Sequence, residues 1–408
     1  MIILRESRKI KAISNSLNMQ DWLSKLMGSI QGILIGLILF VVSIGLLYWN
    51  EGRVDISSVA DKAVEISATE QSTEAEGQLI STSGKITTED LLGDTYLQAG
   101  NYIAVRRNVE MYAWDESSET KSKTTNGENY VDVDENNASN GSEKTYIYNK
   151  VWTSNPDDSA GFKFPAQHQN PQKPLPDKTV TVENAKIGIY EVDLDKAQLP
   201  GFDTVSLSEG NTMLDKGLLT EDDESGMAFF ESFEDIAPTL ESDKYIYKGF
   251  GTLENPEVGD IRISYSVLPA DQDVTVFGQQ SGTKITTYIG EKNSKLYRIF
   301  SGTRSEALSQ MSTEHTTMTW GLRLLGFVLM WIGLGMLLGP ISAVLDFVPL
   351  VGQLSKTVIG IATFIVAAIL SALVIWISMV MHNIVAIIVV VVVIIGIILM
   401  ILKQKSQK

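Results

Sequence analysis

The chain has 408 residues, a hydrophobic content of 44% and a formal net charge of −16 at pH 7. It contains no cysteine, which excludes disulfides, zinc–thiolate sites, iron–sulfur clusters and thiol nucleophiles. The acidic balance argues against nucleic acid as a partner, because a phosphate backbone is bound by basic surfaces.

Four long apolar runs predict four membrane-spanning helices, at residues 28–49, 320–345, 357–381 and 384–402. A helix rises about 1.5 Å per residue, so each run can cross a hydrocarbon core of about 30 Å. The runs show little amphipathic period, which makes buried helices of a soluble protein the weaker interpretation. The first run is too long for a cleaved signal peptide and is interpreted as a signal anchor.

Basic residues at both ends of the chain predict the orientation in the membrane. Residues 1–27 form a basic segment and a candidate interfacial helix, and residues 403–408 form a basic tail. Basic flanks stay in the cytoplasm, so we expect both termini inside and residues 50–319 outside. That outer segment contains 46 acidic and 23 basic residues.

The outer segment is rich in strand patterns. "NYIAVRRNVEMYAW", from Asn101, and "DIRISYSVL", from Asp260, alternate apolar and polar residues as half-buried strands do. Residues 115–143 are polar, and we expect a long mobile loop there. The predicted fold class is an α+β membrane protein, with a large strand-rich extracytoplasmic domain inserted between the first and second spans.

No catalytic, metal or cofactor residues are predicted. The three histidines, His168, His315 and His382, are far apart in the sequence and show no metal-ligand spacing. Acidic clusters such as "TEDDES" are interpreted as solvated loops rather than cation sites. The sequence also lacks phosphate-loop, dinucleotide-binding and nucleophile-elbow motifs.

Charged and aromatic residues meet where the first span ends and the second begins. Trp49 precedes Glu51 and Arg53, and Trp320 precedes Arg323. Aromatic residues favour the membrane interface, so both stretches are expected at the same outer depth. We therefore predict an interface ion pair between Glu51 and Arg323, with Arg53 facing lipid phosphate or an acidic residue.

Small residues at four-residue spacing predict close helix packing. Gly28, Gly32 and Gly36 lie in the first span, and Gly335 and Gly339 in the second. Such spacing lets two helix backbones approach closely in lipid. The sequence leaves open whether the contact is made within one chain or between two.

An apolar turn is predicted at the inner face, between the second and third spans. Pro340 should kink or end the second span, and Pro349 breaks the helix again. Asp346 needs a partner there, because an isolated buried carboxylate is costly. Lys356 is the nearest cation in the sequence, so residues 346–356 are expected to form a cytoplasmic turn.

Several short motifs stand in the order found in a known family. They are "NEGRV", "EGQLISTSGKI", "RRNVEMYAWDE", "YIYNKVW", "HQNP", "NPEVGDIRISYS", "TWGLR" and "LDFVP". Together they resemble the LUMA family, from about residue 22 to the end of the chain. The resemblance implies one span before the domain and three after it, and it transfers no catalytic residue. In animals it implies the endoplasmic reticulum and inner nuclear membrane, with a lumenal domain and partners such as lamins and emerin.

These observations favour an integral membrane scaffold that organises membrane structure or membrane-protein complexes. We expect membrane lipids and a second copy of the chain as partners, and no enzyme activity. The lack of cysteine favours a bacterial cytoplasmic membrane. Two alternatives stay open: a subunit or regulator of an ion-conducting assembly, and an enzyme acting on lipid or envelope material through the outer domain.

Overall fold

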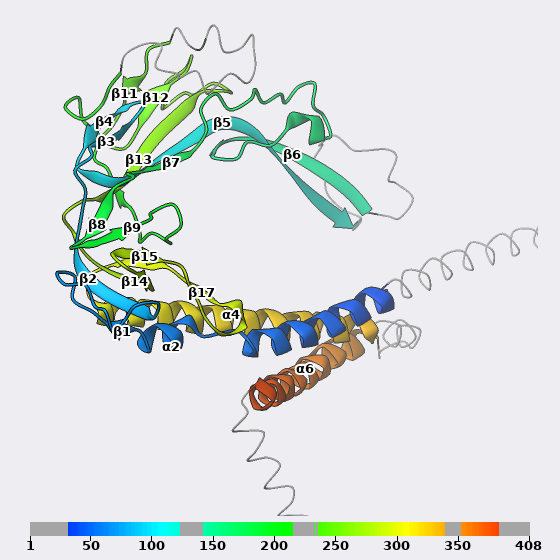
Figure 1. Cartoon of the computed structure of the whole chain (residues 1–408). Helices are drawn as coiled ribbons and strands as arrows, with labels where there is room; N and C mark the ends of the chain where they lie inside the picture. Colours follow the sequence, from blue (N-terminus) through cyan, green and yellow to red (C-terminus); the bar gives the residue numbers. More distant parts are fainter. Residues whose placement is uncertain (1–31, 123–141, 215–232, 234–235, 339–351, 383–408) are drawn as a thin grey trace, which may run out of the picture. The chain divides into compact units, whose positions relative to one another are not determined.

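A computed structural model describes residues 32–122, 142–214, 233, 236–338 and 352–382 (Figure 1). The chain divides into two compact units. A helical unit comprises Met1–Ser58 and Ser309–Lys408, and a strand-rich unit comprises Val59–Leu308. The α+β class predicted from the sequence is confirmed.

Three of the described helices are long and apolar enough to span a membrane, in Gly32–Asp61, Arg304–Leu337 and Gly360–His382. In the first, continuous helix covers residues 32–51, and a short α2 (Ile56–Asp61) follows after a turn. The others are α4 (Arg304–Leu337) and α6 (Gly352–His382). The predicted fourth span, 384–402, lies outside the described residues, as do the terminal segments 1–27 and 403–408.

Helix α4 begins well before the predicted span at 320. Thr303 and Glu306 form a reciprocal cap: Thr303 N–H donates to the Glu306 carboxylate at 2.8 Å, and Glu306 N–H donates to Thr303 Oγ1 at 3.4 Å. This capping box starts a helix that continues through the polar residues before the apolar run. The sequence-based boundary marked the start of hydrophobicity, whereas the helix starts at its cap.

The three long helices share an apolar core. Leu47, Met330 and Ala367 are fully buried, one from each helix. Polar side chains within the spans find partners in the same helix or in a neighbouring one: Thr363 Oγ1 donates to the Gly360 carbonyl of α6 at 3.0 Å, and Ser371 Oγ of α6 contacts Met330 Sδ of α4 at 3.3 Å. Outward positions are largely apolar, as lipid contact requires.

One sheet of the strand-rich unit closes on itself. Strands β2, β8, β9, β15 and β14 pair in a ring because β2 pairs with both β8 and β14, and β1 and β18 attach outside that ring. Closure leaves few unpaired edges around its apolar core. The strands are β1 (Val64–Glu65), β2 (Leu79–Thr87), β8 (Ala185–Ile187), β9 (Tyr190–Val192), β14 (Asp273–Ser281), β15 (Lys284–Thr286) and β18 (Arg298–Ser301).

A second sheet runs in the order β11-β12-β13-β5-β6, with β10 on β13 and β7 on β5. Its strands are β5 (Tyr102–Ser122), β6 (Ser142–Thr153), β7 (Lys178–Thr181), β10 (Asp203–Thr204), β11 (Thr239–Leu240), β12 (Ile246–Lys248) and β13 (Ile261–Pro269). Alternate residues of β13 are buried, as the "DIRISYSVL" pattern predicts. Smaller elements are β3 (Leu92–Asp94), β4 (Leu97–Gly100), β16 (Tyr288–Ile289), β17 (Lys295–Leu296) and the 3-10 turns Ser159–Gly161 and Glu291–Asn293.

The loop predicted at 115–143 is wrong at both of its ends. Strand β5 continues through residues 115–122, and β6 begins at Ser142, so the two form a long ribbon projecting from the sheet (Figure 1). Polar composition misled the interpretation, because both faces of a two-stranded ribbon can be solvated and polar residues are then compatible with strands. Residues 123–141 lie outside the described part of the chain.

A buried carboxylate organises the turn before β13. Asp260 is fully buried and accepts backbone hydrogen bonds from Phe250 at 2.8 Å, Gly251 at 3.1 Å and Glu257 at 2.7 Å. It also accepts a hydrogen bond from the Tyr247 hydroxyl. Burial and this contact raise the pKa of Tyr247 far above its ordinary value, which keeps the hydroxyl a donor.

We expect Asp260→Ala to lower the unfolding free energy by roughly 3 kcal/mol, because it strands several buried donors at once. Tyr247→Phe removes one donor and leaves the carboxylate its three backbone bonds, so it should cost only about 1 kcal/mol. Chemical unfolding in detergent, followed by tryptophan fluorescence, measures both variants. Equal losses would mean that the carboxylate is not the centre of this turn.

Candidate functional sites

Glu51 and Arg323 lie in contact within the helical unit. Arg323 donates from Nε to Glu51 Oε1 and from a terminal nitrogen to Oε2, each at 2.8 Å. The side chains are only 5% (Glu51) and 15% (Arg323) exposed, so this pair is shielded from solvent. The guanidinium also lies over the Trp320 ring, 4.7 Å from its centroid. Two-point geometry of this kind fixes both the separation and the orientation of the two helices at this level.

Asn50 completes this contact from the neighbouring position. Its side-chain nitrogen donates to the Thr319 carbonyl at 3.1 Å and to Glu51 Oε1 at 3.3 Å. The Arg53 guanidinium donates to Asn50 Oδ1 at 3.4 Å and lies 5.8 Å from the Trp49 ring. Arg53, predicted to face lipid phosphate or an acidic residue, is thus placed against the side chains of its own helix end.

The end of α6 joins the same cluster. Ser378 Oγ donates to the Tyr48 carbonyl at 2.9 Å, and His382 Nδ1 lies 2.9 Å from the Ser378 carbonyl. The His382 ring packs on Tyr48 with a centroid separation of 4.7 Å. A Cβ at Gly52 would lie 2.4 Å from His382 Nε2, so any larger residue there would require the His382 ring to shift. We call Asn50, Glu51, Arg323, Ser378 and His382 the interhelix clamp.

Of the glycines predicted to pack closely, Gly36 contacts another helix, whereas Gly32 and Gly335 do not within the described part of the chain. A Cβ on Gly36 would lie 2.8 Å from the Gly333 carbonyl, so these two glycines bring the first long helix and α4 together within the chain. Among the described residues nothing lies within 4 Å of a Cβ built at Gly32 or Gly335. Gly28 and Gly339 lie outside the described residues.

The inner-face turn is not described. Pro340, Asp346 and Pro349 lie outside the described residues, and Lys356 lies in α6 without a described side chain. The pairing of Asp346 with Lys356 therefore stays a prediction.

Sequence reasoning missed several contributors to these contacts. In α4, Gly326 contacts Leu47 of the first helix and Gly333 contacts Gly36. The two α4 glycines are seven residues apart and therefore lie on one face of the helix, a spacing that is visible in the sequence. Ser378 and His382 lie one turn apart on α6. Nothing in the sequence links them to Tyr48, because that contact depends on the arrangement of three helices.

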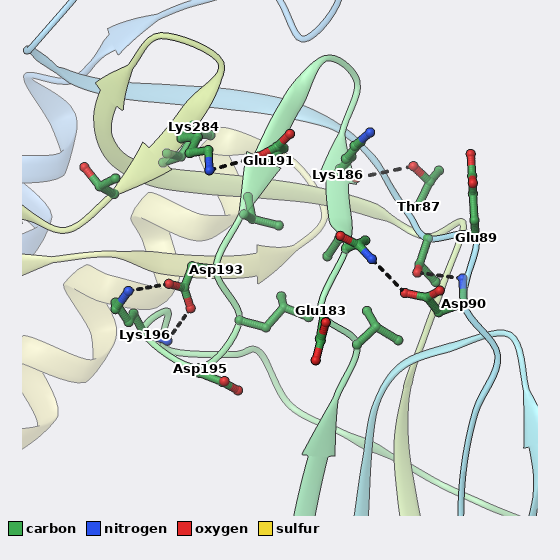
Figure 2. A pocket seen from close by; sticks show the side chains of 18 residues that line it. Thr87, Glu89, Asp90, Glu183, Lys186, Glu191, Asp193, Asp195, Lys196 and Lys284 are labelled. Atoms are coloured by element: carbon green, nitrogen blue, oxygen red, sulfur yellow. Dashed lines mark hydrogen bonds and ion pairs between the residues drawn. The ribbon is translucent and has the colours of Figure 1, made fainter.

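An open groove of about 870 Å³ lies in the strand-rich unit (Figure 2). Six acidic and three basic side chains line it, and two ion pairs form among them: Lys196 with Asp193 at 2.6 Å and Lys284 with Glu191 at 3.5 Å. The Lys196 hydrogen bond holds the pKa of Asp193 below its ordinary value. Within the described part of the chain, no three histidine, aspartate or glutamate side chains are grouped to hold a metal ion.

An aromatic cluster stiffens the β5–β6 ribbon. The His168 ring stacks on Tyr148 with centroids 3.6 Å apart and meets the Trp114 edge at 4.7 Å. The Tyr148 hydroxyl donates to Glu116 and accepts a hydrogen bond from Phe164 N–H at 2.9 Å. Burial, together with the hydrogen bond to Glu116, raises the pKa of Tyr148. His168 is therefore a packing residue on one face of the ribbon.

Asn170, two residues further on, caps the outer edge of β5. Its Oδ1 accepts a hydrogen bond from Trp114 N–H at 2.7 Å, and its Nδ2 donates to the Trp114 carbonyl at 2.9 Å. A side-chain amide thus satisfies both backbone groups that a neighbouring strand would have paired. The "HQNP" motif thereby ends the sheet on this side.

The family model for transmembrane protein 43 matches residues 111–384. The chain belongs to the transmembrane protein 43, or LUMA, family. The matched range contains the ribbon strand β6, the Asn170 cap, α4 and the α6 side of the clamp. The resemblance drawn from the short motifs is therefore confirmed.

Curated relatives match along most of their length. Transmembrane protein 43 of Mus musculus is 25% identical over 90% of this chain and 89% of its own length, and that of Homo sapiens is 25% identical over 91% and 88%. A transmembrane protein 43 homolog of Drosophila melanogaster is 27% identical over 74% of each chain. No solved structure matches the chain.

We expect Glu51→Gln and Arg323→Gln each to lower the unfolding free energy by roughly 2 kcal/mol, because each leaves a shielded charge without its partner. The double variant should lose less than the sum of the singles, with a coupling of at least about 1 kcal/mol. Arg53→Gln, whose partner is a neutral amide, is the control and should change stability little. Additive losses would show that the contact does not stabilise the folded helices.

We expect Gly36→Ala to destabilise the helical unit by about 1–3 kcal/mol, because its methyl group would press on the Gly333 backbone. Gly32→Ala places the same methyl group where the described residues leave open space, and it should be neutral in this respect. Thermal unfolding in detergent compares the two. Equal effects would mean that the close approach at Gly36 is not specific.

Proposed function

We propose that this family member is an integral membrane scaffold that organises membrane structure or membrane-protein complexes through self-association. In this proposal the termini lie in the cytoplasm and the strand-rich unit lies on the other side of the membrane. The chain is a membrane protein of its family, and the scaffold role, the self-association and the orientation are the proposed parts.

The projecting β5–β6 ribbon is the observation that carries the proposal. An isolated two-stranded ribbon is marginally stable in water, yet this one extends over a full register from Met111–Thr153 to Ser122–Ser142. The aromatic cluster on one of its faces offsets the missing third strand. A stiffened projection of this kind offers surface for a protein partner while contributing little to its own unit's core.

The interhelix clamp supports the same role from the membrane side. The chain leaves the helical unit after Ser58 and re-enters it at Ser309, so two connections lead to the strand-rich unit. Glu51 and Arg323 join the helices that carry these two connections. An assembly element benefits from such a fixed base, because binding then orders fewer degrees of freedom.

We expect the purified chain in mild detergent to form particles of at least two copies, set against a monomer of 44.9 kDa. Light scattering corrected for bound detergent measures the protein mass. The same measurement in lipid nanodiscs controls for dissociation by detergent. A monomer in both media at all concentrations would contradict self-association.

A further inference from the structure

At the base of the ribbon, its two edges differ in what covers them. On the β5 side, Tyr112 N–H donates to the Asp260 carbonyl at 2.8 Å, and the Tyr112 carbonyl accepts a hydrogen bond from Gly259 N–H at 2.9 Å. Trp114, two residues on, is capped by Asn170. In a strand, alternate residues direct their backbone groups to opposite edges. Tyr112 and Trp114 therefore face away from β6, and Ala113 and its alternate neighbours face towards it.

The register then settles which groups of β6 point outwards. Ala113 pairs with Val151 and Asp115 with Asn149, so the odd-numbered residues of β6 bond to β5. The even-numbered residues direct their backbone N–H and C=O groups to the free edge. These are Lys144, Tyr146, Tyr148, Lys150 and Trp152. Within the part of the chain that the structure describes, the backbone groups of these five residues have no hydrogen-bond partner at that edge.

An unpaired strand edge is a template for another strand. The residues whose backbone groups face this edge are Lys, Tyr, Tyr, Lys and Trp in chain order. When this series is set against the same series running in the opposite direction, each lysine falls opposite an aromatic residue. If two β6 strands pair antiparallel about Tyr148, Tyr146 lies opposite Lys150 and Lys144 opposite Trp152. Directly opposite residues have Cβ atoms about 5 Å apart, so each lysine meets an aromatic ring of the other copy.

Neighbouring registers fit less well. Moving the centre one residue towards the N-terminus sets Lys144 opposite Lys150, a like-charge pair that destabilises a sheet. Moving it one residue towards the C-terminus sets Lys144 opposite Ser154, beyond the end of β6. The register centred on Tyr148 alone among these three places both lysines opposite aromatic residues.

We propose that two copies of this chain associate through the free edge of β6, as an antiparallel strand pair centred on Tyr148. The occupant of the edge is thus a second copy, and the interface is two-fold symmetric, each copy contributing the same strand. The inference rests on the proposed self-association and specifies its surface. It accounts for the difference between the two edges at the base of the ribbon, where Tyr112 and Trp114 of β5 are covered while their partners in the pair, Trp152 and Lys150 of β6, are left available.

Cysteine cross-linking tests the register without background, since the natural chain has no cysteine. One chain carries Tyr146→Cys and a differently tagged chain carries Lys150→Cys. In the proposed register these positions form a hydrogen-bonded pair with Cα atoms about 5.5 Å apart, which is within the disulfide range of about 4.4–6.8 Å. Under mild oxidation the mixture should give cross-linked heterodimer, approaching about half of all chains under random pairing.

Each variant alone is the matched control. Two copies of Tyr146→Cys would hold their cysteines four residues out of register, more than about 13 Å apart, and should cross-link several-fold less than the mixture. The same holds for Lys150→Cys. Cross-linking as strong in either variant alone as in the mixture would overturn the register.

A backbone variant tests the edge itself. Lys150→Pro removes the lysine side chain and an outward N–H, a loss of donor that an edge strand tolerates. Lys150→Ala removes the same side chain but keeps that donor. Because neither variant keeps a cysteine at position 150, particle mass is measured instead of cross-linking. Lys150→Pro should lower the particle mass, and Lys150→Ala should lower it less, while circular dichroism shows the strand-rich unit folded in both.

The outcomes separate this inference from the proposed function. Oligomeric particles without heterodimer cross-links, and unchanged by Lys150→Pro, would overturn pairing through β6 and leave self-association standing. Monomers in detergent and in nanodiscs would overturn both. Cross-linking in the mixture together with loss of mass in Lys150→Pro would establish the β6 edge as the interface.

Discussion

The arrangement of the helices depends on one charge pair, between the end of the first long helix and the middle of α4. Exposed ion pairs contribute little because water competes for both partners. The Glu51–Arg323 pair is shielded, is made through two hydrogen bonds, and is supported by Asn50 and the Trp320 ring. Since the hydrophobic effect does not drive helices together in lipid, close packing and directional polar contacts select the orientation. Gly36 and Gly333 then set how closely the two backbones approach further along.

In the strand-rich unit, polar side chains hold backbone segments in place. Asp260 accepts hydrogen bonds from the backbone of the turn before β13. Asn170 makes the two hydrogen bonds to Trp114 that a neighbouring strand would otherwise make. Both use a short side chain to satisfy backbone groups that the sheet leaves unpaired. The second sheet therefore has defined limits on the β5 side, set by particular side chains rather than by the end of an apolar pattern.

The parts of the fold that follow from local pattern were predictable from the sequence. Alternation identified β13, and a common membrane depth brought Glu51 and Arg323 together although they are far apart along the chain. Closure of the first sheet was not predictable, because its parallel pairing of β9 with β15 joins segments with no shared signal. Gly36 meets Gly333, which the sequence analysis did not single out, since helix rotation decides which of several glycines faces the contact. Part of the ribbon was predicted as a loop because polar residues are common both in loops and in solvent-exposed strands.

A single strand, β5, belongs to both the second sheet and the ribbon. It pairs with β13 over its first half and with β6 over its second, without a break at the change of partner. A pull along the ribbon would thus load the β5–β13 hydrogen bonds in shear, where many bonds resist together. A sideways pull would instead peel them one after another. The molecule is therefore mechanically anisotropic, and resists tension along β5 far better than tension across it.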